Sequence, residues 1–159
     1  MPNLPLRKYN LFFPVLVILL AACHREKPQK SRTEIITASP WKYYQAGLDL
    51  DNNGTIDTTL RADLLPVCYT DNMLTFKADS IGILDENINR CLPSRPQTSS
   101  FTWYFLNNET EIFMSAMLLP LFEGTFKIVE LTDTKFSITR LVGVHGFPSY
   151  LTYVVVYVH

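Results

Sequence analysis

The chain has 159 residues, of which 47% are hydrophobic and 18% charged, with a formal net charge of −1. This length suits a single domain with its own hydrophobic core. No run of basic residues follows position 34, so the composition argues against nucleic acid as a partner.

The first 22 residues have the order of a secretory signal. Arg7 and Lys8 form a basic end, an apolar stretch runs from Leu11 to Leu20, and two alanines precede Cys23. The apolar stretch is shorter than the roughly 20 residues that a membrane-spanning helix needs. We therefore expect residues 1–22 to be cleaved. They hold two of the 14 basic residues and none of the 15 acidic ones, so the remaining 137 residues would carry a net charge of −3.

The segment Leu20–Cys23 resembles the lipobox of bacterial lipoproteins. In that family the signal is cut directly before the cysteine, and the mature chain begins with that residue in lipidated form. The resemblance implies that Cys23 anchors the chain in a membrane, since several acyl chains hold a protein stably. His24 follows instead of an aspartate, which implies release to the outer membrane, facing either side. An ordinary signal with an incidental cysteine is the alternative.

Two further segments complete the predicted organisation. Residues 23–38 are interpreted as the lipidated N-terminus and a flexible tether, because the chain from His24 to Glu34 is polar and locally basic. The folded domain is predicted to span residues 39–159.

Short segments of alternating hydrophobicity predict about eight β-strands in this domain. Met73–Ala78, for example, places Leu74, Phe76 and Ala78 on one face. The other predicted strands are Trp41–Leu48, Ile81–Leu84, Thr102–Leu106, Glu111–Met117, Thr125–Leu131, Lys135–Thr139 and Leu151–Val158. Between Asp57 and Pro66 the alternation fails, and the spacing of the leucines predicts one short helical turn before Cys68.

The fold class is predicted to be all-β. About eight sequential antiparallel strands with short connections bury one face and lose their edges in a single up-and-down barrel. The last strand, Leu151–Val158, is apolar on both faces and is predicted to close the barrel against the first. A two-sheet β-sandwich is the alternative that periodicity does not separate from the barrel.

The stretch from Asp49 to Asp57 matches the first half of an EF-hand calcium loop. The candidate ligands are Asp49, Asp51, Asn53, the carbonyl of Thr55 and Asp57, with Gly54 at the sharp turn. The twelfth position, where a bidentate glutamate belongs, is Leu60. The sequence thus predicts at most weak, structural calcium binding, and the alternative is a polar hairpin turn at Asn53 and Gly54.

With Cys23 assigned to the anchor, Cys68 and Cys91 remain available to each other. Exported proteins meet oxidants, so we expect these two residues to form a disulfide. A metal site is the alternative, but neither cysteine has a histidine or a second cysteine at ligand spacing.

Aromatic residues make up 13% of the chain and are predicted to point into the barrel. An eight-stranded barrel either is filled by its side chains or holds one small ligand, and both alternatives remain at this point. The candidate lining residues are Trp41, Tyr43, Phe76, Trp103, Phe105, Phe126 and Phe136. Catalytic motifs are absent from the sequence, and His145 has no nucleophile or metal ligand near it in the chain, so we expect a protein that is not an enzyme.

Several short motifs together resemble the lipocalin-like domain of small bacterial lipoproteins. They are Trp41-Lys42, the Asp49–Asp57 loop, Cys68–Asn72 leading into Leu74–Asp79, Asp85–Asn87 with Cys91, Trp103, Gly124–Ile128 and Leu131–Ile138. The resemblance implies a lipocalin-like barrel in the cell envelope, expected as a monomer.

Two functions follow as expectations. The first is a membrane-anchored barrel that binds a small apolar ligand or an envelope component. The alternative is a protein-binding inhibitor or adaptor with a filled barrel, for which Leu118–Phe122 is an apolar loop that could contact the partner.

Overall fold

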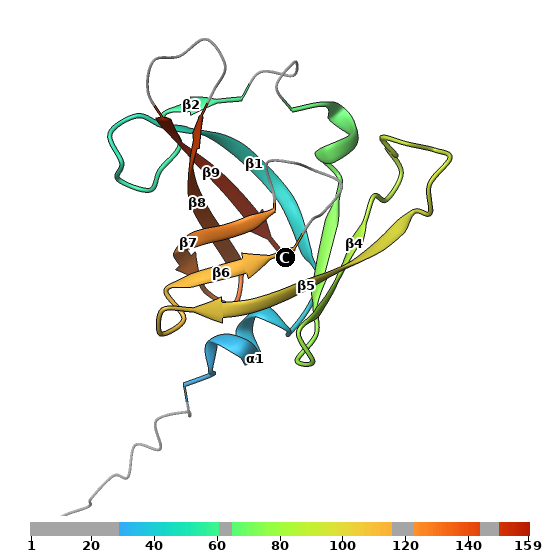
Figure 1. The fold of residues 1–159 in the computed structure, drawn as a ribbon, viewed down its shortest axis with the longest axis horizontal. Coiled ribbons are helices and arrows are strands. Elements are labelled where there is room, and N and C mark those ends of the chain that lie inside the picture. Colours follow the sequence, from blue (N-terminus) through green and yellow to red (C-terminus); the bar gives the residue numbers. More distant parts are fainter. Residues whose placement is uncertain (1–28, 61–64, 116–122, 144–149) are drawn as a thin grey trace, which may run out of the picture.

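A computed structural model describes residues 29–60, 65–115, 123–143 and 150–159 (Figure 1). Cys23, Leu118–Phe122 and His145 lie outside the described residues. Within these ranges the chain forms a short helix, α1 (Arg32–Ile36), a 3₁₀ helix, η1 (Val67–Tyr69), and strands β1 (Trp41–Asp49), β2 (Thr58–Thr59), β3 (Met73–Phe76), β4 (Ile81–Asp85), β5 (Thr98–Leu106), β6 (Glu111–Met114), β7 (Gly124–Leu131), β8 (Lys135–Gly143) and β9 (Tyr150–Val158). None of the helices in the described residues is long and apolar enough to cross a membrane.

Eight of the strands close into one antiparallel barrel. β1 pairs with β3 along one edge and with β9 along the other, and the strands from β3 to β9 pair in sequence order. The predicted up-and-down barrel is therefore confirmed, including closure of the last strand against the first. β2 is an additional strand that continues the edge of β1 at Gly47 and Leu48.

The alternation of buried and less buried residues in the strands agrees with the sequence pattern. In β3 the side chains of Leu74 and Phe76 are buried while their neighbours are half-buried, as expected for a pleated strand with one face in the core. β5 begins at Thr98, four residues before the predicted start. Its first three residues, Thr98 to Ser100, are all polar, so they show no alternation, yet they pair with β4.

The helical segments differ from the sequence prediction. The turn expected before Cys68 is η1, which contains Cys68, whereas Thr58 and Thr59 form β2 and residues 61–64 lie outside the described residues. The predicted tether also contains an ordered element. α1 begins with a capping box at Ser31 and Glu34, and the ordered domain therefore starts before residue 39.

α1 closes one end of the barrel. Ile36 is fully buried in the core, and its carbonyl accepts a hydrogen bond from the Trp41 indole N–H at 2.8 Å. His159 packs on the Trp41 ring at the same end, with ring centroids 3.8 Å apart. The loop between β1 and β2 and η1 lie at the opposite end (Figure 1).

Candidate binding sites on the barrel

Aromatic side chains pack against one another in the barrel core. Phe76 lies at the centre, with its ring centroid 5.3 Å from that of Trp103 and 5.9 Å from that of Phe136. Trp41 in turn lies 5.7 Å from Phe136. Six of the seven predicted lining residues are buried, Trp41, Tyr43, Phe76, Trp103, Phe126 and Phe136. The two contacts of Phe76 are edge-to-face, an arrangement typical of packed aromatic cores.

Phe105 is the exception among the predicted lining residues. It is only partly buried, packs on Trp103 at 5.5 Å, and lies under the guanidinium of Arg32, 6.0 Å from its ring centroid. It therefore belongs to the contact between α1 and the barrel, where it joins the helix to the core.

Two tyrosine side chains, Tyr43 and Tyr157, are also buried in the core. Burial raises the pKa of Tyr43 to about 12, although a backbone hydrogen bond at Ala46 opposes the shift. Burial also raises the pKa of Tyr157, whose ring meets that of Tyr43 edge-on at 6.4 Å. Both side chains thus stay neutral at physiological pH.

The predicted calcium loop brings its three carboxylates together. Asp49, Asp51 and Asp57 each offer an oxygen, and these oxygens lie within 4.8 Å of one another. The same carboxylates also accept hydrogen bonds from the loop. Asp49 accepts from the backbone N–H of Gly54 at 2.7 Å, and Asp57 from that of Leu50 at 2.7 Å.

The other predicted ligands stabilise the turn. The Asn53 side-chain oxygen accepts from the Thr55 backbone N–H at 2.7 Å and from its hydroxyl. Leu60, at the twelfth position, packs against the hydrophobic core, which explains why no ligand occurs there. The geometry allows weak cation binding, and calcium stays a prediction.

Burial alone would raise the pKa of the Asp49 carboxyl, which is only 2% exposed. The N–H groups of Gly54 and Asn53 outweigh that effect and hold the pKa of Asp49 below its ordinary value. The loop thus keeps a buried carboxylate ionised through its own backbone.

This loop lies against the outer surface of the barrel. Gly54 has a positive φ of 87°, and a Cβ atom there would lie 2.8 Å from a methyl carbon of Val129 in β7. Thr152 of β9 donates its hydroxyl to the Asn52 side-chain oxygen at 2.5 Å. Glycine is therefore required both for the turn and for this close approach.

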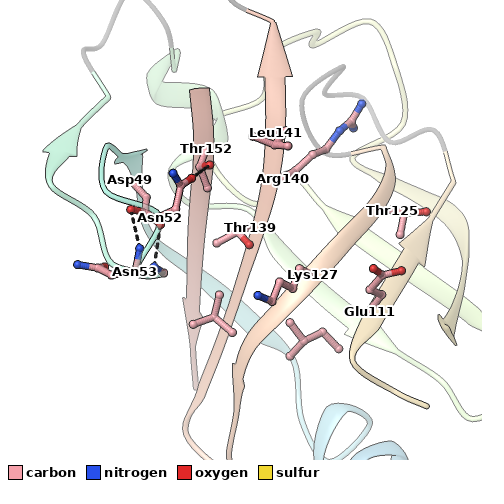
Figure 2. Close-up of a pocket in the computed structure, with 13 residues that line it drawn as sticks. Asp49, Asn52, Asn53, Glu111, Thr125, Lys127, Thr139, Arg140, Leu141 and Thr152 are labelled. Atoms are coloured by element: carbon pink, nitrogen blue, oxygen red, sulfur yellow. Dashed lines mark hydrogen bonds between the residues drawn. The ribbon is translucent and has the colours of Figure 1, made fainter. Parts of the chain in front are cut away.

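Beside the loop is a groove of about 580 Å³ on the outer surface of β6 to β9 (Figure 2). Its lining combines cations, Lys127 and Arg140, with the carboxylate of Glu111 and with the exposed Leu141. Arg140 also donates a hydrogen bond to the Glu123 carbonyl. The groove has the mixed polar and apolar character of a contact surface.

Cys68 and Cys91 form the predicted disulfide, with Cα atoms 5.0 Å apart. The bond joins η1 to the loop between β4 and β5. A pocket of about 350 Å³ lies over it, lined by Pro66, Cys68, Tyr69, Glu86, Cys91 and Leu92. Glu86 was missed in the sequence analysis, where Asp85–Asn87 entered only as part of a family motif.

These features define a closed, disulfide-bonded, antiparallel β-barrel protein, with a groove on its outer surface and a pocket over its disulfide among the described residues. No protein-family model matches the chain, and a search of curated proteins finds no similar sequence.

Proposed function

We propose that this protein is anchored in the bacterial cell envelope through lipidated Cys23 and binds another envelope component through the outer surface of its barrel. The observation that carries the proposal is the packing of the barrel interior. Five of the seven side chains expected to line a ligand cavity form ring contacts with one another at centroid distances of 5.3 to 5.9 Å: Trp41, Phe76, Trp103, Phe105 and Phe136.

The outer groove supports the choice of surface. Leu141 is 65% exposed and lines the groove together with the charged residues Glu111, Lys127 and Arg140. Protein interfaces combine an apolar centre with a polar rim, and the groove offers both kinds of group. The proposed partner is therefore a protein, and the proposed activity is non-catalytic binding.

The first test is native mass spectrometry of the Cys23→Ser protein exported in its own host. We expect the bare polypeptide mass. A reproducible adduct of small-molecule mass would support the alternative, a barrel that carries a small apolar ligand, and would overturn the proposal. The anchor is tested separately: an unmodified native chain that retains residues before Cys23 would refute lipidation.

The second test places a photo-crosslinking amino acid at Leu141 and, as a matched control, at Ile81. Both positions are exposed strand residues, but Ile81 lies in β4, outside the groove. We expect a discrete crosslinked protein band from position 141 and none from position 81. Equal labelling at both positions would argue against the groove as the contact surface.

A further inference from the structure

The pocket over the disulfide contains a buried carboxylate, one oxygen of which has no hydrogen-bond partner among the described residues. Glu86 is 1% exposed. Its Oε2 accepts a hydrogen bond from the Cys91 backbone N–H at 2.8 Å. Within the described part of the chain, its Oε1 accepts none. Buried carboxylate oxygens without a partner are costly, so Oε1 calls for an external donor.

A second buried polar side chain lies in the segment before β3. The pairing of β3 with β4 extends as far as Met73 and Asp85, and Asn72 and Glu86 are the residues that flank this pair in the chain. Both residues fall on the buried face, one step beyond Leu74 and Leu84. Asn72 is 4% exposed, and in the described ranges neither of its amide atoms has a hydrogen-bond partner.

The arrangement selects among possible cations. A calcium or magnesium ion needs several oxygen ligands, whereas the pocket lining provides one carboxylate. A guanidinium prefers to engage both oxygens of a carboxylate, but Oε2 already accepts from Cys91. A primary ammonium group is a compact cation, and one of its three N–H donors can engage Oε1 alone, without the two-oxygen geometry that a guanidinium prefers.

The pocket walls indicate what carries the ammonium group. Pro66, Tyr69 and Leu92 line it together with the disulfide, and Leu92 is 44% exposed. Apolar walls around one buried anion suit an alkyl chain that ends in a charge.

We propose that this pocket binds a primary ammonium group on a short alkyl chain, with the nitrogen on Glu86 Oε1 and the chain against Pro66, Tyr69 and Leu92. The site is independent of the proposed anchor and of the outer groove. An alkylammonium can come from a free amine or from a lysine side chain, and the experiment separates these two sources.

The test is an NMR titration of the oxidised protein with n-butylammonium chloride, followed through the Cys91 amide, which reports on Glu86. n-Butanol and sodium chloride at matched concentrations are the controls for the alkyl chain and for ionic strength. We expect a saturable shift of the Cys91 amide with butylammonium alone. The same shift with butanol, or no shift, would overturn the proposal, and this arm needs no variant.

Two variants test the assigned residue. Glu86→Gln keeps the shape and the acceptor for Cys91 but removes the charge, and we expect binding to weaken about thirtyfold or more, as on neutralising one partner of a desolvated pair. Glu109→Gln, in the turn between β5 and β6, is the matched control and should bind as the wild type does. Equal affinity of the Glu86 variant would refute the site.

The source is resolved with a short peptide that carries one central lysine between acetylated and amidated ends. Binding of the peptide with the same dependence on Glu86 would identify a lysine side chain as a ligand. Binding of butylammonium without the peptide would identify a free amine, because the pocket would then exclude a chain that continues on both sides.

Discussion

The charge of Asp49, in the loop from Asp49 to Asp57, contributes to the stability of the folded protein. Its carboxylate accepts hydrogen bonds from the backbone N–H groups of Asn53 and Gly54 at 3.1 and 2.7 Å, and its pKa in the folded protein is lowered. A group whose folded pKa is depressed stabilises the protein above its unfolded pKa, which is about 3.9 for aspartate. That stabilisation is lost as the pH falls through the folded value.

We therefore expect Asp49→Asn to lower the free energy of unfolding at neutral pH, because the amide replaces a charged acceptor by a neutral one. The difference from the wild type should shrink as the pH falls below 4. Urea denaturation across this range measures it. Asp133→Asn, which alters an exposed ion pair with Lys30, is the control and should show a much smaller difference. A difference for Asp49 that is independent of pH would contradict the assigned role.

Calcium gives a second prediction for the same loop. Three carboxylate oxygens within 4.8 Å and the missing twelfth ligand predict binding at about 10⁻³ M, the weak end of the range for such loops. Millimolar calcium should then raise Tm slightly in the wild type and leave Asp57→Asn unchanged. If calcium does not change the Tm of the wild type, the calcium site is refuted, and Asp49 and Asp57 only accept hydrogen bonds from the backbone of the loop.

At the scale of the elements, the disulfide joins two segments that carry little regular structure. η1 has three residues, and the loop between β4 and β5 runs from Glu86 to Gln97. Hydrogen bonds from the backbone N–H groups of Ile88 and Asn89 to Asp71 also attach this loop to the segment after η1. The covalent bond therefore constrains a part of the chain that strand pairing does not hold.

Replacing both Cys68 and Cys91 by serine should reduce the free energy of unfolding by about 3 kcal/mol, as the chain-entropy model gives for a loop of this length. The comparison is between urea denaturation of the oxidised wild type and of the double variant. A loss well under 1 kcal/mol would mean that the unfolded chain is already compact around this loop.

α1 stabilises the barrel although it has only five residues. Its capping box, the buried Ile36 and the hydrogen bond from Trp41 attach it to the closed end of the barrel. A helix this short gains its stability from packing and not from propensity.

A chain that begins at residue 39 should therefore be less stable than one that begins at residue 29, by about 2–5 kcal/mol, the range for removing a buried isoleucine side chain. Thermal and urea unfolding of the two chains measure the loss, and Ile36→Ala in the longer chain should reproduce most of it. Equal stability of the two chains would mean that α1 does not stabilise the barrel and belongs to the tether, as the sequence predicted.

For the whole molecule, the sequence predicted most of the barrel because its strands alternate. The order of strands, the closure by the last strand and the disulfide all follow from patterns that are local in sequence or from counting cysteines. The register irregularities at Tyr43/Gln45 and Ile128/Glu130 were not predicted, because a bulge adds one residue without a distinctive sequence signal. α1 was missed because only Ile36 in it is buried.

The candidate sites divide in the same way. The spacing of the acidic residues in the loop from Asp49 to Asp57, here called the acidic loop, is visible in the sequence. The sequence does not show that the backbone N–H groups of this loop compete with a cation for the same carboxylates. The Glu86 pocket depends on the meeting of η1 with the loop after β4, and a single glutamate between two polar residues gives no local signal. The packing of the barrel interior likewise depends on side-chain volumes across strands that are distant in sequence.

Closure of the barrel gives a prediction at this scale. β9 pairs with β1 and β8 and contributes the buried Tyr153, Val155 and Tyr157 to the core. A chain that ends at residue 152 should fail to fold, because β1 and β8 would both become unpaired apolar edges. Circular dichroism and size-exclusion chromatography test this. A monomeric, cooperatively unfolding truncated chain would show that β1 and β8 can close the barrel alone.

The position of α1 also determines how the molecule is oriented when it is held by its N-terminal side. Lys30 and Asp133 form an ion pair 2.7 Å long, and the chain enters the barrel at the end that α1 covers (Figure 1). Any attachment through the preceding residues would therefore direct the opposite end, with the acidic loop and η1, away from the point of attachment. Large partners could then approach that end without obstruction by the surface to which the protein is fixed.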